Sequence, residues 1–137
     1  MATRREQEAK ERFSERYREE QADVVRTIEQ IVIGGDWGAN GYTTLAQADD
    51  LADRLRLHKG GLLLDIGAGR GWPGLYMAAT TRCSVQLADV PTDGHTVAAA
   101  RIRTEHLQQR AWCLNTSARD LPFRAGTFDV VHTDVLY

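Results

Sequence analysis

Cysteine and excess positive charge are both scarce in this chain of 137 residues, and each shortage excludes a class of site. The two cysteines, Cys83 and Cys113, stand far apart, with neither a CxxC pair nor a companion histidine cluster. We therefore expect free, buried thiols, no disulfide framework and no metal site. With 17 Lys and Arg against 19 Asp and Glu, no basic stripe offsets the net charge of -2, so we expect no nucleic-acid partner.

Long apolar runs are also missing from the chain. Every apolar window is too short to span a bilayer, and the charged start of the chain has no apolar segment behind it. This pattern argues against a membrane-spanning helix and a secretory signal, and it predicts a cytoplasmic location with no membrane partner. The length is that of one domain, and the composition is that of an ordinary globular protein.

The most informative stretch that is present is glycine-rich and covers residues 62–74. Its apolar start predicts a buried parallel strand, and its glycines predict a tight turn into a helix that Pro73 can start. Glycine lets the backbone approach a ligand closely, and the first amides of a helix have no partner within the helix. Strand, loop and helix together predict a site for a nucleotide-like cofactor, with a turn that binds no ligand as the alternative.

The spacing of the glycines separates this loop from the dinucleotide-binding fingerprint. That fingerprint has its third glycine three positions after the second, where this chain has Trp72. The observed pattern is Asp-x-Gly-x-Gly-x-Gly, from Asp65 to Gly71. A nicotinamide-dependent oxidoreductase is therefore disfavoured, and the later Pro122-Phe123 segment also argues against it.

This pattern resembles the first motif of class I S-adenosylmethionine-dependent methyltransferases, in particular the methyltransferase type 11-like domains that act on small molecules. The resemblance implies S-adenosylmethionine as the cofactor. It implies that Gly67, Ala68, Gly69 and Gly71 line the methionine end of that cofactor. It also implies that Asp65, at the carboxyl end of the first strand, reaches the ammonium group directly or through water.

A second acidic residue, Asp89, stands at the end of a strand predicted over residues 84–88. It lies about twenty residues after the first glycine, where doubly wound folds place an acid that accepts hydrogen bonds from ribose hydroxyls. Asp89 and the neighbouring Val90 are therefore candidate cofactor-binding residues. The alternative for Asp89 is a solvent-facing turn before Pro91.

A helix predicted over residues 95–109 and a strand over 111–115 lead to a further segment that resembles the same family, residues 116–123. The family has Gly-Asp-Ala-x-x-Leu-Pro-Phe here, and its acidic residue receives the adenine amino group. Ser117 stands at the acidic position and Ala118 follows it, so the resemblance implies an adenine-binding role for both. A serine hydroxyl accepts a weaker hydrogen bond than a carboxylate does.

Residues 126–137 resemble the family's Phe-Asp-x-Val strand, the fourth of the sheet. The resemblance places Thr133 and Asp134 at its carboxyl end, beside the methyl-transfer centre. Thr133 is therefore a candidate cofactor contact, and Asp134 is the candidate catalytic base. We expect His132 to be a packed strand residue rather than a base.

The first 41 residues are predicted to form a helical segment followed by a loop. Charged residues dominate positions 4–20, and glycine is dense at 34–41. Apolar residues at helical spacing form one stripe that can dock on the rest of the chain: Phe13, Tyr17, Val24, Ile28 and Ile31. We interpret this segment as a docking helix, and the alternative is a lid over the cofactor or a dimer contact.

A capping box at Thr44-Leu45-Ala46-Gln47 predicts the start of a helix over residues 44–57. In such a box the threonine hydroxyl and the glutamine side chain each satisfy a free amide. Tyr42, which precedes the helix, is a candidate contact to cofactor or substrate by the same resemblance, with plain packing as the alternative.

These elements predict an α/β fold, a Rossmann-like doubly wound parallel sheet preceded by N-terminal helices. The resemblance implies the order 3-2-1-4 for the first four strands and a larger sheet in which the fourth strand is central. We expect residues 42–137 to be an S-adenosylmethionine-binding methyltransferase domain that is incomplete at its C-terminus. A fragment, a shortened paralogue, and a homodimer that pairs through the fourth-strand edge are the explanations left open.

On this resemblance the chain transfers a methyl group from S-adenosylmethionine to a small-molecule acceptor, without a metal. Because the sulfonium is already reactive, the protein mainly orients the reactants and excludes water. The alternative is a truncated, non-catalytic module of the same fold that binds the cofactor or a partner chain.

Overall fold

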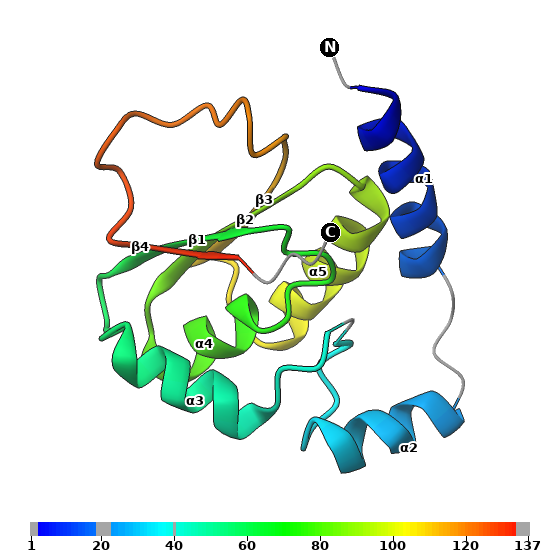
Figure 1. Cartoon of the computed structure of the whole chain (residues 1–137). Helices are drawn as coiled ribbons and strands as arrows, with labels where there is room; N and C mark the ends of the chain where they lie inside the picture. Colours follow the sequence, from blue (N-terminus) through cyan, green and yellow to red (C-terminus); the bar gives the residue numbers. More distant parts are fainter. Residues whose placement is uncertain (1–2, 19–22, 40, 134–137) are drawn as a thin grey trace.

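The computed structural model describes residues 3–18, 23–39 and 41–133, which Figure 1 draws in colour. Within them lies one four-stranded sheet whose strands are all parallel, in the order β3-β2-β1-β4. The strands are β1 (Leu62–Ile66), β2 (Ser84–Asp89), β3 (Ala111–Asn115) and β4 (Val130–Thr133). The predicted α/β fold and the predicted strand order are both confirmed. Asp134, the candidate base, lies outside the described residues.

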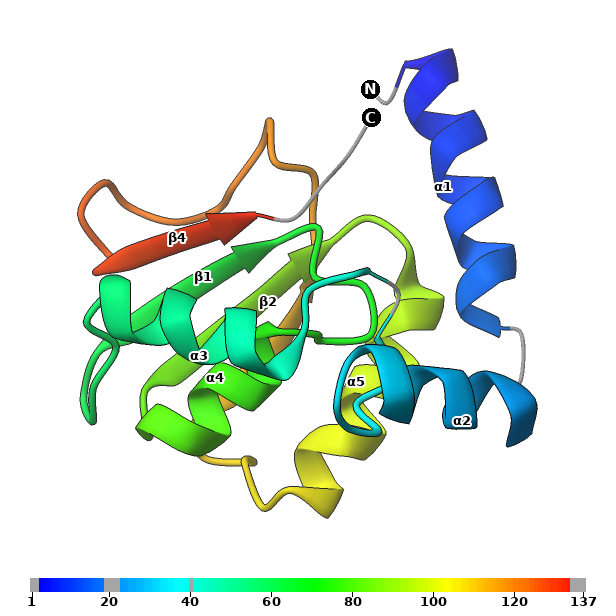
Figure 2. The ribbon, with the colours of Figure 1, turned by 60° about the horizontal axis from the view of Figure 1, so that its bottom comes forward.

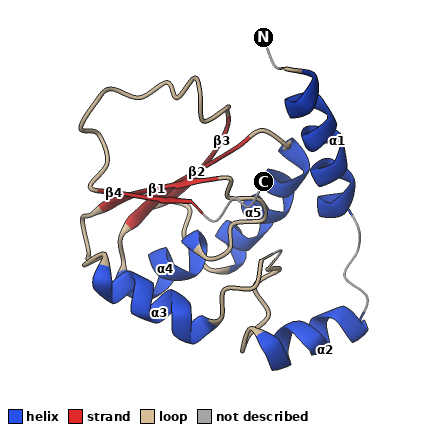
Figure 3. Cartoon of the chain, viewed as in Figure 1, coloured by secondary structure: helices blue, strands red, loops and turns tan. Residues whose placement is uncertain are grey.

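The helices of the described segments either precede the sheet or cross over between its strands. They are α1 (Arg4–Arg18), α2 (Asp23–Val32), α3 (Leu45–Arg54), α4 (Gly74–Thr81) and α5 (Thr92–Thr104). Figures 2 and 3 show α3, α4 and α5 on one face of the sheet, with α1 and α2 beside it. Because α4 and α5 are successive crossovers that advance in the same direction along the sheet, right-handed connections place both on the same face.

The register of the sheet brings the ends of its strands to one edge. Ile66, the last residue of β1, pairs with Ala88 of β2 and Thr133 of β4. Asp89 follows at the same edge, opposite Asn115 of β3. The loops that leave β1 and β2 therefore start side by side, as ligand-binding loops of open parallel sheets do.

The two faces of the sheet are buried to different degrees. Leu63, Val85 and Leu87 face the helices and are fully buried. On the opposite face Trp112 and Val131 are 45% and 57% exposed. No helix among the described residues covers this second face, which carries only the loop that runs from β3 to β4 (Figure 1).

The prediction that one apolar stripe of the N-terminal segment docks on the rest of the chain is confirmed at Tyr17 and is wrong for the residues on α2. Tyr17 is buried, whereas Val24, Ile28 and Ile31 on α2 are 68%, 55% and 77% exposed. The residue that α2 turns inward is instead Glu29, whose carboxylate accepts hydrogen bonds from the backbone N–H groups of the loop at residues 37 and 39. Satisfying buried backbone amides therefore decides the orientation of α2, against its apolar pattern.

Two helices end earlier than their sequence patterns predict. We expected α5 over residues 95–109, but it runs from Thr92 to Thr104, and α3 ends at Arg54 rather than near 57. In each case a non-glycine residue just past the helix, His106 or Arg56, takes a left-handed backbone conformation with φ of 55° or 52°. A hydrogen bond from the next amide then closes the helix end, as in the Schellman motif that usually contains glycine. Because neither position is a glycine, the residue pattern does not indicate where these two helices end.

Several local predictions are confirmed. The strand at 111–115 has the predicted bounds, and the helix predicted after the glycine turn is present as α4, which begins at Gly74, directly after Pro73. Both cysteines are free, Cys83 being buried and Cys113 partly buried. None of the helices in the described part of the chain is long and apolar enough to cross a bilayer.

The capping box is confirmed, and it yields a stability prediction. The Thr44 hydroxyl accepts a hydrogen bond from the backbone N–H of Gln47 at 3.2 Å, and the Gln47 side chain accepts one from the N–H of Thr44 at 2.9 Å. We expect Thr44→Ala to lower the free energy of unfolding by about 1 kcal/mol, because it leaves an amide of the first turn without a partner. Urea unfolding followed by circular dichroism measures this. Thr44→Ser keeps the hydroxyl and is expected to stay near the parent value, so an equal loss in both variants would contradict the capping role.

Candidate functional site

A cavity of about 1210 Å³ opens at the carboxyl edge of the sheet. Its walls come from the glycine-rich loop after β1, the turn after β2, the loop after β3, the segment at residues 41–51 and one side of α1. Figure 2 shows these segments around the ends of the strands, with α1 standing across from them. The sequence-predicted residues that line it are Tyr42, Asp65, Gly67, Ala68, Gly69, Asp89, Val90, Ser117 and Ala118.

The glycine-rich loop is held against the end of β2. The N–H groups of Gly67 and Ala68 donate to the carbonyl of Ala88 at 2.8 and 3.3 Å. Gly71, which does not itself line the cavity, has a φ of 94°, and a Cβ there would come within 2.5 Å of the Leu75 side chain. The loop conformation therefore requires glycine at this position, and its backbone is fixed before any ligand arrives.

Asp89 joins this loop to the turn after β2. Its two carboxylate oxygens accept hydrogen bonds from the backbone N–H groups of Gly69 and Val90, both at 2.8 Å. Burial raises the pKa of Asp89 above its ordinary value, while these two hydrogen bonds, the nearby His95 and the Tyr17 hydroxyl act to lower it. Each carboxylate oxygen can accept more than one hydrogen bond, so the group retains acceptor capacity toward the cavity.

Asp65 lies deeper than its predicted role implies. Its side chain is 2% exposed, and one carboxylate oxygen is 2.8 Å from Nδ1 of His132. His132 is a packed strand residue, as predicted, but the sequence reasoning missed this contact. The signal that could have found it is the parallel register, which pairs position 65 of β1 with position 132 of β4.

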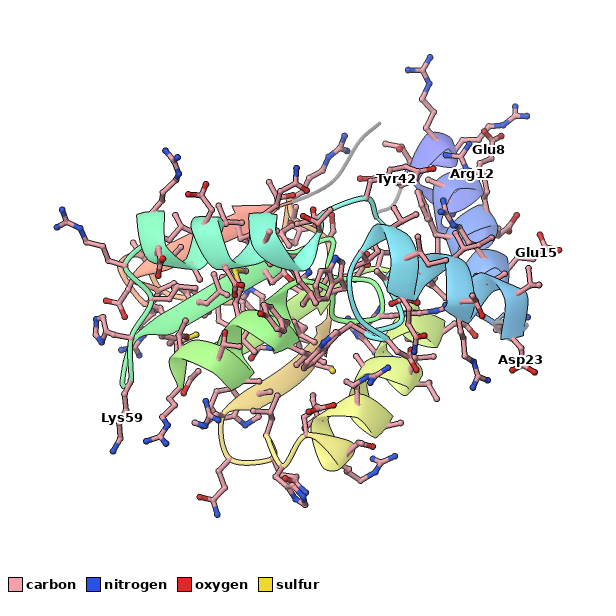
Figure 4. All side chains as sticks on the ribbon, turned by 90° about the horizontal axis from the view of Figure 1, so that it is seen from below. Glu8, Arg12, Glu15, Asp23, Tyr42 and Lys59 are labelled. Atoms are coloured by element: carbon pink, nitrogen blue, oxygen red, sulfur yellow. The ribbon has the colours of Figure 1, made fainter. Side chains whose placement is uncertain are left out.

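Tyr42 and Ser117 occupy more exposed parts of the wall. Tyr42 is 83% exposed, and Figure 4 shows it on the side of the molecule where α1 stands. The Ser117 hydroxyl accepts a hydrogen bond from the N–H of Arg119 at 3.2 Å. Thr133 lies exposed at the end of β4 and is not among the residues that line the cavity.

The sequence reasoning named α1 as a docking helix or a lid, and the structure has it docked as a wall of the cavity. The guanidinium of Arg70, in the glycine-rich loop, donates to the carbonyls of Arg16 and Tyr17 at 3.1 and 2.9 Å. The Tyr17 hydroxyl lies so close to Gly69 that a Cβ there would be 2.9 Å away from it. Ion pairs at 3.3 Å, Arg18 with Asp93 and Glu6 with Arg119, tie the helix to α5 and to the loop after β3.

The described residues hold no group of three or more His, Cys, Asp or Glu side chains that could bind a metal ion. The cavity walls offer carboxylate acceptors, backbone groups and aromatic surface, and also basic side chains from α1 and from the loops after β1 and β3. Two acids stand at neighbouring strand ends, one beside the glycine-rich loop and one beneath it. Such a set suits a ligand with vicinal hydroxyls and a positive charge.

The attachment of α1 through Arg70 yields a testable consequence. Arg70→Met keeps most of the aliphatic stem but removes the donors to two helix carbonyls, so we expect α1 to open more easily by about 1–2 kcal/mol. Amide hydrogen exchange within α1 then accelerates by about tenfold or more. Arg4→Met is the matched control: it breaks an exposed ion pair within α1 and is expected to change exchange only slightly. Equal acceleration in both variants would show that Arg70 is not the attachment point.

Comparison with known proteins shows which family the chain belongs to. The sequence model of a methyltransferase domain matches residues 63–137, more than half of the chain. Methyltransferase GfsG of Streptomyces halstedii is 33% identical over 81 residues, a match that spans 59% of this chain and 29% of that protein.

Two solved structures show the same fold in longer chains. The [4+2]-cyclase SpnF is similar with a TM-score of 0.56 and 27% identity, over 80% of this chain and 45% of that one. A phosphoethanolamine N-methyltransferase of Haemonchus contortus, solved with S-adenosylhomocysteine, has a TM-score of 0.63 and 23% identity, over 82% of this chain and 26% of that one. The chain thus spans less than half the length of each of these relatives. On the family match and this fold, the chain belongs to the methyltransferase domain family, whose cofactor is S-adenosylmethionine.

Proposed function

We propose that the cavity binds S-adenosylmethionine and that the protein transfers its methyl group to a small-molecule acceptor. The observation that carries this proposal is the position of Asp89, whose carboxylate is held at the cavity wall by the amides of Gly69 and Val90. This carboxylate already accepts hydrogen bonds from the two amides and from the Tyr17 hydroxyl, and its remaining acceptor site suits a ribose hydroxyl. The residues present therefore fit the cofactor of the family.

The other cofactor contacts follow from this anchor. Gly67, Ala68 and Gly69 form the surface against which the methionine part lies, since no Cβ obstructs the glycines, and the predicted role of Gly71 is limited to shaping the turn behind that surface. Asp65 supplies the negative charge for the ammonium group. We assign these roles because the glycine-rich loop starts directly after Asp65 and is hydrogen-bonded to Asp89.

The adenine end falls to the opposite side of the cavity in this proposal. Val90, Ser117 and Ala118 line that side. Tyr42 and Thr133 remain predicted contacts, and Tyr42 already faces the cavity. We also keep the division of the chain into residues 1–41 and 42–137 as a proposal, with α1 serving the second part as a wall.

When bound, S-adenosylmethionine would supply an activated methyl group on its sulfonium, which a nucleophile of the acceptor would take in line as the carbon–sulfur bond breaks and S-adenosylhomocysteine leaves. The residues of this chain then have two tasks, to orient the reactants and to keep water out. The glycine-rich loop and Asp89 perform the first, and α1, fastened through Arg70, performs the second. Asp134 remains the predicted base for the acceptor.

A second function has one observation in its favour. Trp112 and Val131 are exposed on the face of the sheet that no described helix covers, which suits a cofactor-binding module that works through a partner chain. Since β4 is also an edge strand of the four described strands, pairing of two copies through that edge is the form of this proposal that can be tested directly.

For that edge, Val131→Lys is the informative change. A lysine on an exposed edge strand discourages pairing with another strand, so a dimer formed there dissociates while the fold is kept. Sedimentation over a range of concentrations measures the dimer, with Val24→Lys on the distant α2 as the control. A parent chain that stays monomeric, or a dimer that survives Val131→Lys, contradicts the edge-paired form.

The cofactor site is tested by calorimetric titration with S-adenosylhomocysteine. We expect Asp89→Asn to weaken binding by about tenfold to a hundredfold, because a charge-assisted hydrogen bond to the ribose is lost. Asp53→Asn, on the exposed side of α3, is the matched control and is expected to bind as the parent does. A folded parent chain that gives no binding heat would overturn the proposed site.

The same titration has a predicted pH dependence. Since burial raises the pKa of Asp89 above its ordinary value, its carboxylate takes up a proton at a higher pH than an ordinary aspartate does. Affinity for S-adenosylhomocysteine therefore falls as the pH is lowered through that raised pKa, and the fall occurs at a higher pH than titration of an ordinary aspartate would give. Asp89→Asn is expected to lose most of this dependence. His95, which interacts with Asp89 and whose pKa is lowered by burial, contributes to the part that remains.

A further inference from the structure

Asp65 and His132 form a buried pair on neighbouring parallel strands. The register of β1 and β4 pairs the two positions, so both side chains lie on the face of the sheet that the helices cover. Their closest atoms, Oδ1 of Asp65 and Nδ1 of His132, are 2.8 Å apart, and the side chains are 2% and 10% exposed. An ionised carboxylate only accepts hydrogen bonds, so Nδ1 carries the hydrogen and donates it.

The carboxylate of Asp65 is also confined by its other neighbours. Gly74, at the start of α4, lies against it so closely that a Cβ at this position would overlap the second carboxylate oxygen. The Leu87 side chain of β2 packs beside it, 3.2 Å from where a Cβ of residue 74 would lie. Asp65 lines the cavity directly before the glycine-rich loop. A group packed on these sides has few orientations, and the hydrogen bond from His132 selects among them.

We propose that His132 is a positioning residue for the cofactor: it holds the Asp65 carboxylate in the orientation that receives the ammonium group of the methionine part. The inference rests on the proposed function, since it assumes that S-adenosylmethionine occupies the cavity. His132 acts through Asp65 and does not line the cavity. Thus β4 contributes to cofactor binding through a side chain that packs behind the site.

The chemistry of imidazole suits this task. A lysine or arginine at position 132 would bring a permanent positive charge beside the buried carboxylate and compete with the ammonium group for it. An imidazole donates one hydrogen bond from Nδ1 and carries no permanent charge, so it does not have to compete with the ammonium group for Asp65. An apolar residue would leave that buried charge with one stabilising hydrogen bond fewer, and the carboxylate would be free to turn.

A matched pair of substitutions tests the inference. His132→Asn places an amide nitrogen on Cγ, the atom that carries Nδ1 in histidine, and so keeps the donor. His132→Leu has a similar shape without a donor. The two ligands are S-adenosylhomocysteine, which has the ammonium group, and 5′-methylthioadenosine, which keeps the adenosine and sulfur but lacks the amino acid part.

We expect His132→Leu to bind S-adenosylhomocysteine about tenfold more weakly and 5′-methylthioadenosine within about twofold of the parent. His132→Asn is expected to stay within about threefold of the parent for both ligands. Asp65→Asn should show the same ligand selectivity, and adding His132→Leu to it should cause little further loss, because both changes remove one interaction. Circular dichroism melts confirm that each variant is folded.

The outcomes separate this inference from the proposed function. If the folded parent binds neither ligand, the proposed cofactor site is wrong and the inference is wrong with it. If the parent binds both, and His132→Leu weakens both equally or neither, His132 only supports the fold and the inference alone is overturned. Should His132→Leu fail to fold, His132→Gln replaces it, since its amide donor lies one bond farther out and is expected to show the same selective loss.

Discussion

The carboxylate of Asp89 is the constraint on which the rest of the site depends. It binds the amides of Gly69 and Val90 at once, and thereby fixes the loop after β1 against the turn after β2. This is possible only because parallel pairing brings the ends of β1 and β2 to one edge. The same carboxylate is buried at a cost, as the rise of its pKa indicates, and the backbone donors offset part of that cost.

The cavity is completed by a helix that lies far from the sheet in sequence. Tyr17 of α1 packs on the glycine-rich loop, and Arg70 of that loop binds the helix carbonyls. Polar groups make the attachment in both N-terminal helices, since Glu29 in turn fixes the backbone at residues 37 and 39. Hydrogen bonds are directional, so they specify one arrangement of a helix where an apolar stripe would allow several. This explains why α1 is held in one position against the glycine-rich loop.

Membership of the methyltransferase domain family does not by itself settle the chemistry of a chain. The fold is shared with proteins named as methyltransferases and with one named as a [4+2]-cyclase. What distinguishes members is the set of side chains around the cofactor. In this chain the acids at positions 65 and 89 stand in different surroundings, one beneath the loop against an imidazole and one among backbone amides. Such a division suits a ligand with a cation at one end and hydroxyls in the middle.

The sequence alone determined the elements whose signals are local: the strand and glycine turn around Asp65, the capping box at Thr44, and the strand order that follows from the family motif. It also placed the two acids at strand ends. Only the tertiary structure decided that His132 lies against Asp65, that Arg70 holds α1, and which side of α2 faces inward. These depend on contacts between residues more than fifty positions apart or on buried amides that need a partner. The periodicity of apolar residues in the sequence shows only which face of an element is apolar. It therefore predicts neither these distant contacts nor the partners of buried amides.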